Sequence, residues 1–350
     1  MNATFWQGKT VFVTGHTGFK GAWLSFWLSQ MGAHVTGFSD RVPTNPSAFE
    51  ALDLKSLVTD IRGDVRDLDA LRKAMDAVSP EIVLHLAAQP LVIPGFNDPA
   101  GTYSANVMGT VNLLEAVRQN GKVKACVVVT SDKVYKNKEK KQGYMEGDTL
   151  GGDDPYAGSK ACAELVVETF RNAFLRDITP TATARAGNVI GGGDWAPYRL
   201  IPDVITALHE NKPLEIRRPK AARPWQHVLE PLSGYLTLAE KLYTEGQKFA
   251  GAYNFGPRKT DCRPVGEVID AVSRAWGGTP QITKAVSAYH ETSLLRLQTG
   301  KAAKELGWRP TWPLSTAIEK TAAWYKAYYG GEDMAKVTAE QIEKFGLKKG

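Results

Sequence analysis

Two side chains one helical turn apart, Tyr156 and Lys160, are the first candidates for chemistry in this sequence. On a helix, residues i and i+4 lie on one face, so the ammonium of the lysine can sit near the phenol. A free phenol has a pKa of about 10, and a nearby positive charge favours the phenolate. We therefore expect Tyr156 to act as a base at neutral pH, with Lys160 lowering its pKa.

Ser131, Asp132 and Lys133 bring a hydroxyl, a carboxyl and an amine together, directly after the apolar run 124–130. At the end of a buried strand, these groups could serve as hydrogen-bond donor, general acid and general base. Serine and aspartate also begin helices and turns, so Ser131 and Asp132 could instead form a cap. Residue type alone leaves both interpretations open.

Arginines recur farther along the chain, at Arg199, Arg217 and Arg223. A guanidinium group binds a diphosphate through forked hydrogen bonds. Each arginine alone is typical of a protein surface, but as a set they predict an anionic substrate.

The stretch 11–31 is the element that must position these groups. It predicts a β-branched strand, a turn with Gly15, Gly18 and Gly21 in G-x-x-G-x-x-G spacing, and an apolar helix. Glycines at this spacing allow a tight turn, close approach of the backbone to a pyrophosphate, and close packing of helix on strand. The helix would point its free N–H groups at that phosphate. We interpret the stretch as a dinucleotide-binding turn.

Strands and helices alternate from residue 11 to about 190, which predicts an α/β fold with a doubly wound parallel (Rossmann-like) sheet. His85 lies inside an apolar run and is expected to be a hydrogen-bonded core residue rather than a catalyst. Active sites in such sheets lie at the carboxyl ends of the strands. We expect strands at 33–38, 81–89 and 124–130, and helices at 68–78 and 103–120.

Beyond residue 190 prolines become frequent and the alternation stops. We therefore predict a smaller C-terminal substrate-binding lobe. The dinucleotide-binding domain would comprise residues 1–190 and a return segment at about 226–256. The lobe would comprise about 191–225 and 257–350.

Two acids are placed to bind the adenosine half of a dinucleotide. Asp40 follows Gly15 by 25 residues, roughly where a ribose-binding carboxylate is expected, although a plain loop aspartate fits equally well. The neighbouring Arg41 could favour a 2′-phosphate, so NAD is preferred while NADP stays open. Asp64 could border the adenine or simply cap a helix.

The composition excludes several classes of protein. Hydrophobic residues make up 43% and charged residues 23%, as in ordinary globular proteins. The net charge of +6, from 43 basic and 37 acidic residues, is mostly dispersed, which argues against nucleic acid as a partner. We find no membrane-spanning run and no secretion signal, so we expect a cytoplasmic protein. Three scattered cysteines fit free thiols, and no cluster has metal-ligand spacing, so no metal is expected.

Several further segments match one known family: 86–92, 106–110, 130–133, 185–195 and 223–235, besides the glycine turn and the Tyr156–Lys160 pair. On these segments the chain resembles the extended short-chain dehydrogenase/reductase family, within its group of NAD-dependent sugar-nucleotide dehydratases and epimerases. The resemblance covers nearly the whole chain. Members acting on dTDP-glucose carry Thr-Asp-Glu where this chain has Ser131-Asp132-Lys133, which favours the branch acting on CDP-hexoses.

The resemblance implies a tightly held NAD and a nucleotide-sugar substrate, with residues for each. The catalytic residues would be Ser131, Asp132, Lys133, Tyr156 and Lys160. The cofactor would contact Gly15, Thr17, Gly18, Phe19, Gly21, Asp40, Asp64, Val65, Leu86, Ala87, Ala88, Gln89, Thr130, Tyr156 and Lys160. The substrate would contact Gln89, Asn188, Arg199, Arg217, Arg223 and Asn254.

The implied reaction turns CDP-glucose into CDP-4-keto-6-deoxyglucose. Tyr156 would take the proton of the sugar 4-hydroxyl, whose oxygen Ser131 polarises, while NAD receives the C4 hydride. Lys133 would remove the C5 proton, and Asp132 would protonate the departing 6-hydroxyl. The hydride would then return to C6.

One segment departs from that branch. An arginine and, shortly after it, a serine and an aromatic are usual after Val92, but this chain has the run Ile93-Pro-Gly-Phe-Asn97. The change is either drift in a loop or a sign of an altered sugar or product.

Two other functions compete with the dehydratase. A 4-epimerase shares the glycine turn, the Tyr156–Lys160 pair and a transient 4-ketone, but it needs no acid and base for elimination. Asp132 and Lys133 therefore argue against it. A dinucleotide sensor without chemistry would not need Tyr156, Lys160 and Asp132 together.

The resemblance also implies a homodimer or a tetramer. The pairing face would be formed by the helix at 103–120 and the helix that begins near Tyr156. Val107, Val111, Leu114 and Val117 have the helical spacing of such a face, although a core helix would show the same spacing.

Overall fold

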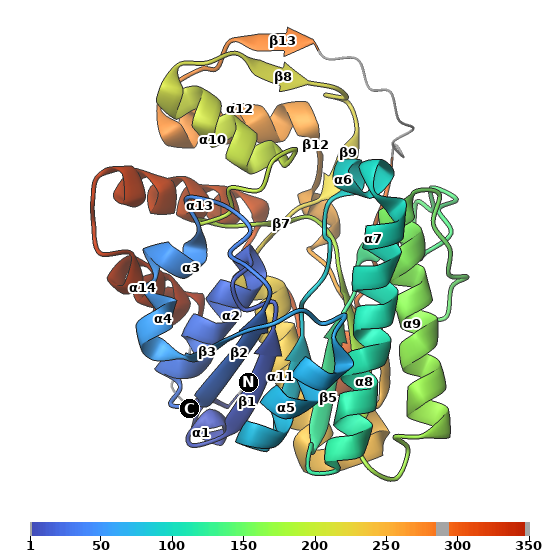
Figure 1. Cartoon of the computed structure of the whole chain (residues 1–350). Coiled ribbons are helices and arrows are strands. Elements are labelled where there is room, and N and C mark those ends of the chain that lie inside the picture. Colours follow the sequence, from blue (N-terminus) through green and yellow to red (C-terminus); the bar gives the residue numbers. More distant parts are fainter. Residues whose placement is uncertain (1, 285–293, 347–350) are drawn as a thin grey trace.

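Seven parallel strands form the central sheet of the protein (Figure 1). The structure, a computed structural model, describes residues 2–284 and 294–346. The strand order reverses between β1 and β4, and ligands bind at such a switch in open parallel sheets. The predicted doubly wound sheet is thereby confirmed. In spatial order the strands are β11 (Gly251–Phe255), β6 (Thr181–Ala186), β5 (Ala125–Val129), β4 (Ile82–His85), β1 (Thr10–Thr14), β2 (His34–Ser39) and β3 (Thr59–Arg62).

Both faces of the sheet are buried, as β1 shows. Val11 and Val13 belong to one hydrophobic core, whereas Phe12 between them belongs to the other. The first core packs α2 (Phe19–Gln30) and α11 (Leu229–Glu245); the second packs α5 (Leu68–Val78), α8 (Gly109–Asn120) and α9 (Pro155–Ala173). Strands covered on both faces are continuous apolar runs, which is why the sequence predicted them.

The predicted helix at 68–78 is confirmed as α5. The predicted helix at 103–120 is part of a longer helical run made of α7 (Pro99–Tyr103), the π-helical η1 (Ser104–Met108) and α8. The predicted strand 81–89 ends at His85, and the residues after it form a loop at the edge of the sheet. Among the described helices, none combines the length and apolar character that a membrane crossing requires.

Two segments sit above the carboxyl ends of the strands in Figure 1, one between β6 and α11 and the other after β11. β8 pairs with β13 and β9 pairs with β12 in two small sheets. These elements are β7 (Val189–Ile190), α10 (Leu200–Glu210), β8 (Leu214–Ile216), β9 (Ala222–Pro224), β10 (Gln226–His227), η4 (Lys259–Asp261), β12 (Cys262–Pro264), α12 (Val265–Trp276) and β13 (Ile282–Lys284).

The C-terminal helices return toward the sheet. Phe345 of α14 (Met334–Gly346) meets Trp27 of α2 with ring centroids 6.0 Å apart. This contact joins α14, which belongs to the predicted substrate-binding lobe, to α2 of the predicted dinucleotide-binding domain. The division into two lobes stays a prediction. The remaining elements are α1 (Ala3–Trp6), α3 (Ala48–Ala51), α4 (Leu54–Leu57), α6 (Val92–Asn97), η2 (Asp132–Val134), η3 (Gly246–Phe249), η5 (Ala302–Leu306) and α13 (Leu314–Tyr329).

Candidate active site

The glycine turn between β1 and α2 is closely packed. Gly15 has a φ of +74°, and a Cβ there would lie 2.6 Å from the backbone N of Ala87. A Cβ on Gly21 would lie 2.0 Å from the carbonyl oxygen of Gly15. Gly18 is the N-cap of α2, and the first N–H groups of a helix have no intrahelical acceptor. A turn of this kind fits a dinucleotide phosphate.

Side chains around the turn hold it against the sheet. The hydroxyl of Thr17 donates to the carbonyl of Arg41 at 2.7 Å. His16 is fully buried, with Nδ1 3.0 Å from Ser39 Oγ and Nε2 3.0 Å from Asp60 Oδ1. Sequence reasoning missed His16, whose only signal was its place inside the glycine turn.

The two predicted adenosine acids lie at the same edge of the sheet, after the adjacent strands β2 and β3. Asp40 is largely exposed and lies 3.8 Å from the Arg41 guanidinium. Arg66 Nη2 lies 2.5 Å from Asp64 Oδ2, and the hydrogen bonds that Arg66 donates hold the pKa of Asp64 below its usual value. Val65 is buried in the second core. Contacts of these residues with a cofactor stay predictions.

The loop after β4 begins beside the glycine turn. Thr14 Oγ1 lies 2.7 Å from His85 Nδ1 and accepts the N–H of Ala87 at 3.2 Å. Burial lowers the pKa of His85 to about 3. His85 is therefore confirmed as a hydrogen-bonded core residue. Leu86 packs against the first core and Ala87 against the second, with Ala88 following them in the loop.

Gln89 uses its side-chain amide inside this loop. Its Nε2 donates to the Leu91 carbonyl and to Thr102 Oγ1, both at 2.9 Å, and its Oε1 accepts the N–H of Leu91 at 2.6 Å. The structure gives Gln89 a loop-shaping role, and its contact with a substrate stays a prediction.

Residue type left two roles open for Ser131 and Asp132, a helix cap and a part in catalysis. The structure shows the cap, and the buried carboxyl remains suited to catalysis. Ser131 caps η2, because its Oγ accepts the N–H of Lys133 at 3.2 Å, and it also lies 3.2 Å from Asp132 Oδ1. Asp132 is buried and its Oδ2 has no hydrogen-bond partner among the described residues. Burial raises the pKa of Asp132 to about 6, while the positive charges of Lys133 and Arg223 oppose that rise. Such a carboxyl can carry a proton close to neutral pH.

Tyr156 is the second residue of α9, whose N-cap Asp154 accepts the N–H of Ala157 at 2.8 Å. Burial raises the pKa of Tyr156, while a hydrogen bond with Ser131 and the charge of Arg199 act in the opposite direction. The sequence predicted that Lys160 and a positive nicotinamide ring together lower this pKa. For the protein's own groups the expectation is wrong, and the contribution of nicotinamide stays a prediction.

Lys160 explains the difference. Its Nζ donates to the carbonyl of Val129 at 3.2 Å, at the end of β5, instead of to the phenol of Tyr156. Burial lowers the pKa of Lys160 to about 8, and Glu164 opposes that shift. The i and i+4 spacing places both residues on one helix face, but packing directs the ammonium toward the sheet.

Two of the three predicted substrate arginines reach the catalytic cluster. Arg199 donates to Asp194 Oδ2 at 2.8 Å and lies close enough to Tyr156 to affect its pKa. The charge of Arg223 likewise lowers the pKa of Asp132. Arg217 instead acts on a third acid, the exposed Asp203 of α10, whose pKa its charge lowers.

Asn188 is the second residue after the end of β6, next to the same cluster. A Cβ on Gly187 would lie 2.6 Å from Asp132 Oδ2, so the carboxyl packs directly on this backbone. The main-chain carbonyl of Asn188 accepts the N–H of Gln226 at 3.0 Å. Its contact with a substrate stays a prediction.

Phe19 lies in the first turn of α2 and faces Gly191. A Cβ on Gly191 would lie 3.1 Å from the ring of Phe19.

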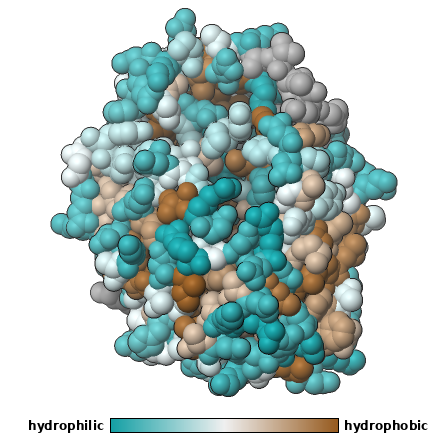
Figure 2. Space-filling model, in the orientation of Figure 1, coloured by the Kyte–Doolittle hydropathy of each residue, from teal (hydrophilic) through white to brown (hydrophobic). Residues whose placement is uncertain are grey.

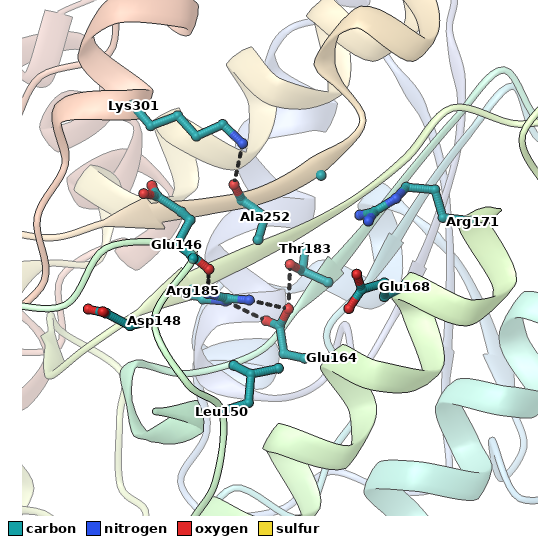
Figure 3. A pocket seen from close by; sticks show the side chains of 12 residues that line it. Glu146, Asp148, Leu150, Glu164, Glu168, Arg171, Thr183, Arg185, Ala252 and Lys301 are labelled. Carbon is teal, nitrogen blue, oxygen red and sulfur yellow. Dashed lines mark hydrogen bonds and ion pairs between the residues drawn. The ribbon is translucent and has the colours of Figure 1, made fainter. Parts of the chain in front are cut away.

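Glu164 lies one turn beyond Lys160 and is surrounded by donors (Figure 3). Arg185 donates to it through Nε at 2.9 Å and Nη2 at 2.8 Å. The hydroxyls of Thr130 and Thr183 donate to it at 2.5 and 2.7 Å. The hydroxyl of Thr130 is therefore engaged within the protein, and its predicted cofactor contact is not tested by this geometry.

Asn254 belongs to the same network. Tyr135 accepts from Arg185 Nη1 and donates to Asn254 Oδ1, both at 2.7 Å, and Asn254 Nδ2 donates to the Tyr144 carbonyl at 3.0 Å. A cavity of about 450 Å³ borders Glu164 and Arg185, as the close view in Figure 3 shows. None of the five predicted catalytic residues lines it. We therefore interpret the network as structural.

The departing segment at Ile93 and Pro94 lies in α6, which packs against α9. A Cβ on Gly95 would lie 3.5 Å from the backbone N of Tyr156 and 3.4 Å from Gln89 Nε2. The segment therefore rests on the start of the catalytic helix.

Sequence reasoning missed Lys20 and Tyr235. Lys20 is half-buried in the first turn of α2, with Nζ 5.7 Å from the ring centroid of Tyr235 on α11. The only sequence signal was a charged residue between Gly18 and Gly21, in an otherwise apolar helix start.

Comparisons with known proteins agree with this geometry. Residues 11–256 match the NAD dependent epimerase/dehydratase family. The chain is 48% identical over 352 residues to CDP-glucose 4,6-dehydratase of Salmonella typhimurium, covering 99% of this chain and 98% of that protein. It is 28% identical over 346 residues to UDP-glucuronate 4-epimerase 4 of Arabidopsis thaliana, covering 94% of this chain and 78% of that protein.

A solved structure shares the fold at low identity. The dTDP-glucose 4,6-dehydratase of Bacillus anthracis, in complex with NAD, superposes with a TM-score of 0.77 at 21% identity, covering 94% of this chain and 100% of that chain. The family match spans well over half of the residues and includes the glycine turn and the cluster around Tyr156. The chain therefore belongs to the NAD dependent epimerase/dehydratase family, and its cofactor is NAD.

Proposed function

We propose that the protein is a sugar-nucleotide 4,6-dehydratase, a hydro-lyase that converts CDP-glucose to CDP-4-keto-6-deoxyglucose. The observation that carries this proposal is the buried carboxyl of Asp132, whose Oδ2 has no partner within the described residues. It stands between Ser131 and Lys133 at the end of β5, and it can hold a proton near neutral pH. The 48% identity to a protein of that name supports the same activity.

NAD would be held at its phosphates by the turn of Gly15, Gly18 and Gly21, and near its reacting end by Tyr156 and Lys160. When bound, it supplies a reversible hydride acceptor. All remaining steps are proton transfers and positioning, and these fall to side chains of the protein.

In the first step Tyr156, as phenolate, takes the proton of the sugar 4-hydroxyl while C4 is oxidised to a ketone. Ser131, hydrogen-bonded to Tyr156, polarises the oxygen. Because burial disfavours the phenolate, positive charges must offset it, and the charge of Arg199 acts in that direction.

In the second step the 4-ketone acidifies the C5 proton, which Lys133 removes. Asp132 protonates the 6-hydroxyl, so that water leaves and a C5–C6 double bond forms. When C6 is reduced, a proton returns to C5, and the product is the 4-keto-6-deoxy sugar.

The test is to incubate the purified protein with CDP-glucose and, separately, with dTDP-glucose, and to follow product mass and C4 stereochemistry. We expect loss of one water from CDP-glucose. A C4 epimer of unchanged mass would support the epimerase instead. No turnover of either nucleotide sugar would contradict the proposal.

We also propose a homodimer formed through α7, η1 and α9. Large apolar side chains are exposed there: Tyr103 by 40%, Met108 by 50% and Leu165 by 52%. Figure 2 shows brown side chains gathered on the side of the molecule where α8 and α9 lie. An exposed apolar patch of this kind marks an interaction surface.

Two of the four residues predicted for this face belong elsewhere. Leu114 and Val117 are fully buried in the second core, because α8 turns that side toward the sheet. Light scattering should give a dimer mass that falls to the monomer mass in Leu165→Glu. A monomer mass for the unmodified protein would contradict the proposal.

A further inference from the structure

Arg199 is held by a buried carboxylate. Its Nη1 donates to Asp194 Oδ2 at 2.8 Å, and the Asp194 side chain is only 6% exposed. Asp194 Oδ1 accepts the N–H of Ala196 at 3.0 Å. Both carboxylate oxygens are therefore bound within the short segment 194–199, and one of them ties the guanidinium back to the start of that segment.

Helix α13 anchors the segment from the C-terminal part of the chain. The hydroxyl of Tyr325 accepts the N–H of Asp194 at 3.1 Å and donates to the Asp194 carbonyl. The rings of Tyr325 and Trp195 pack with centroids 5.6 Å apart. A Cβ on Gly192 would lie 2.1 Å from the side chain of Trp324, so the preceding backbone also rests directly on α13. This helix therefore sets the position of the Asp194 carboxylate.

The segment includes a backbone conformation that its surroundings must impose. Tyr198, directly before Arg199, has a φ of +64°, in the left-handed region that bulky residues rarely adopt. Its side chain is 54% exposed, so burial of the ring does not explain this conformation. The ion pair between Asp194 and Arg199 spans Tyr198 in the sequence and offers a reason for it. Strained backbone of this kind clusters at functional sites.

The guanidinium held in this way acts on the catalytic tyrosine. The charges of Arg199 and Tyr156 each affect the pKa of the other group. Burial raises the pKa of Tyr156, and the carboxyls of Asp132 and Asp154 add to that rise. The charge of Arg199 opposes all three effects. The position of this guanidinium therefore bears on whether Tyr156 can lose its proton.

We propose that Asp194 is a positioning residue, anchored by Tyr325, that holds the Arg199 guanidinium where its charge stabilises the Tyr156 phenolate. The inference rests on the proposed function, because it needs Tyr156 as the base that takes the 4-hydroxyl proton. An opposite charge near a titrating group favours its charged form, and the attraction weakens as the two groups separate. A guanidinium released to solvent would therefore leave the phenolate less stable.

The test follows reduction of the cofactor during a single turnover of saturating CDP-glucose by the NAD-loaded protein, from about pH 5 to about pH 10. The quantity compared is the apparent pKa of the acidic limb, where the rate rises as Tyr156 loses its proton. Saturation separates this limb from any change in substrate binding through Arg199. All variants share the other charged and titratable groups of this cluster, namely Lys20, Asp132, Asp154, Lys160 and Tyr235.

Asp194→Ala should move the acidic limb to higher pH by roughly one unit, which slows sugar oxidation about tenfold at pH values below the limb. Tyr325→Phe should move the limb in the same direction by less, because the carboxylate remains. Arg199→Met should give the full shift, and combining it with Asp194→Ala should add nothing. Tyr328→Phe is the matched control on α13, since its ring also packs on Trp195, with centroids 4.8 Å apart. It should leave the limb unchanged.

The direction of the shift is decisive, because loss of the Asp194 charge alone would favour the phenolate and move the limb to lower pH. An unmoved or lowered limb in Asp194→Ala would overturn the inference, as would an unmoved limb in Arg199→Met. If Asp194→Ala does not fold, Tyr325→Phe decides, because it removes no charge, and a limb equal to that of Tyr328→Phe would overturn the inference. These results would leave the proposed function intact. Failure of the unmodified protein to oxidise CDP-glucose would overturn both.

Discussion

Helix α9 passes through two buried polar regions that differ in how fully their atoms are paired. Around Glu164, the carboxylate receives four hydrogen bonds, from Thr130, Thr183 and two nitrogens of Arg185. Two turns earlier, around Tyr156, the neighbouring carboxyl of Asp132 leaves Oδ2 without a partner in the described part of the chain. Each region contains a carboxyl group, an arginine, a tyrosine and a hydroxyl side chain.

The pKa values separate the two regions further. In the region of Tyr156 they move toward neutrality, with Asp132 raised to about 6, Lys20 lowered to about 7 and Lys160 lowered to about 8. In the region of Glu164 the pKa of Arg185 is instead raised, because its pairing with the carboxylate outweighs burial. Complete pairing fixes structure, whereas incomplete pairing leaves groups that can exchange protons with a ligand.

The largest effect on activity is expected at Tyr156. Tyr156→Phe should lower turnover of CDP-glucose by about a thousandfold or more, because phenylalanine cannot take the 4-hydroxyl proton. Binding of NAD should stay largely intact. Tyr243→Phe, at a tyrosine that pairs with Glu81 just before the start of β4, serves as the control. Retention of more than a few per cent of turnover would remove Tyr156 from the base role.

The paired region should respond in stability instead. Glu164→Gln leaves the Arg185 guanidinium buried without its counter-charge, so the free energy of unfolding should fall by about 3–5 kcal/mol. Denaturant unfolding measures this loss. Glu168→Gln, exposed on the same helix, should change it by less than about 0.5 kcal/mol. Equal, small effects of both substitutions would contradict a structural role for the Glu164 network.

Asp132→Asn should separate the two chemical steps. An amide cannot supply the proton that the 6-hydroxyl needs, so dehydration should slow by about a hundredfold or more while oxidation at C4 continues. Accumulated 4-keto-glucose nucleotide, together with the absorbance of reduced cofactor, is the expected readout. If a natively folded variant no longer oxidises the sugar, Asp132 has another role.

Restoring an arginine at Ile93 and a serine at Pro94 tests whether α6 contacts the sugar. A charge-assisted hydrogen bond contributes about 1.5–3 kcal/mol, so CDP-glucose turnover should rise about ten- to a hundredfold if the segment lines the pocket. Turnover and product mass are both measured. No change in either would mean that the altered segment is drift, despite the position of Gly95 against Tyr156.

A change of pH tests the Asp132 carboxyl without any substitution. Asp132 must carry a proton to donate it, and burial raises its pKa to about 6. Above that value the protonated fraction falls about tenfold per pH unit. Single-turnover dehydration should therefore slow as the pH rises from about 6 to about 8. A dehydration rate that rises over this range would argue against Asp132 as the acid.

Local patterns in the sequence were enough to predict the parts of this site that lie close together along the chain. The strand, glycines and helix of residues 10–30 form one continuous unit, and Ser131 follows a strand whose both faces are buried. Tyr156 and Lys160 had to share a helix face because helical geometry requires it. The order of strands and helices likewise predicted the parallel sheet.

Only the tertiary structure decided what each buried group meets. Lys20 and Tyr235 are far apart in sequence, and packing of α2 against α11 brings them together. Lys160 turned toward Val129 rather than Tyr156, and Asn254 joined the Glu164 network through Tyr135. Burial and the charges of distant segments set pKa values and hydrogen-bond partners, and neither is encoded in the spacing of neighbouring residues.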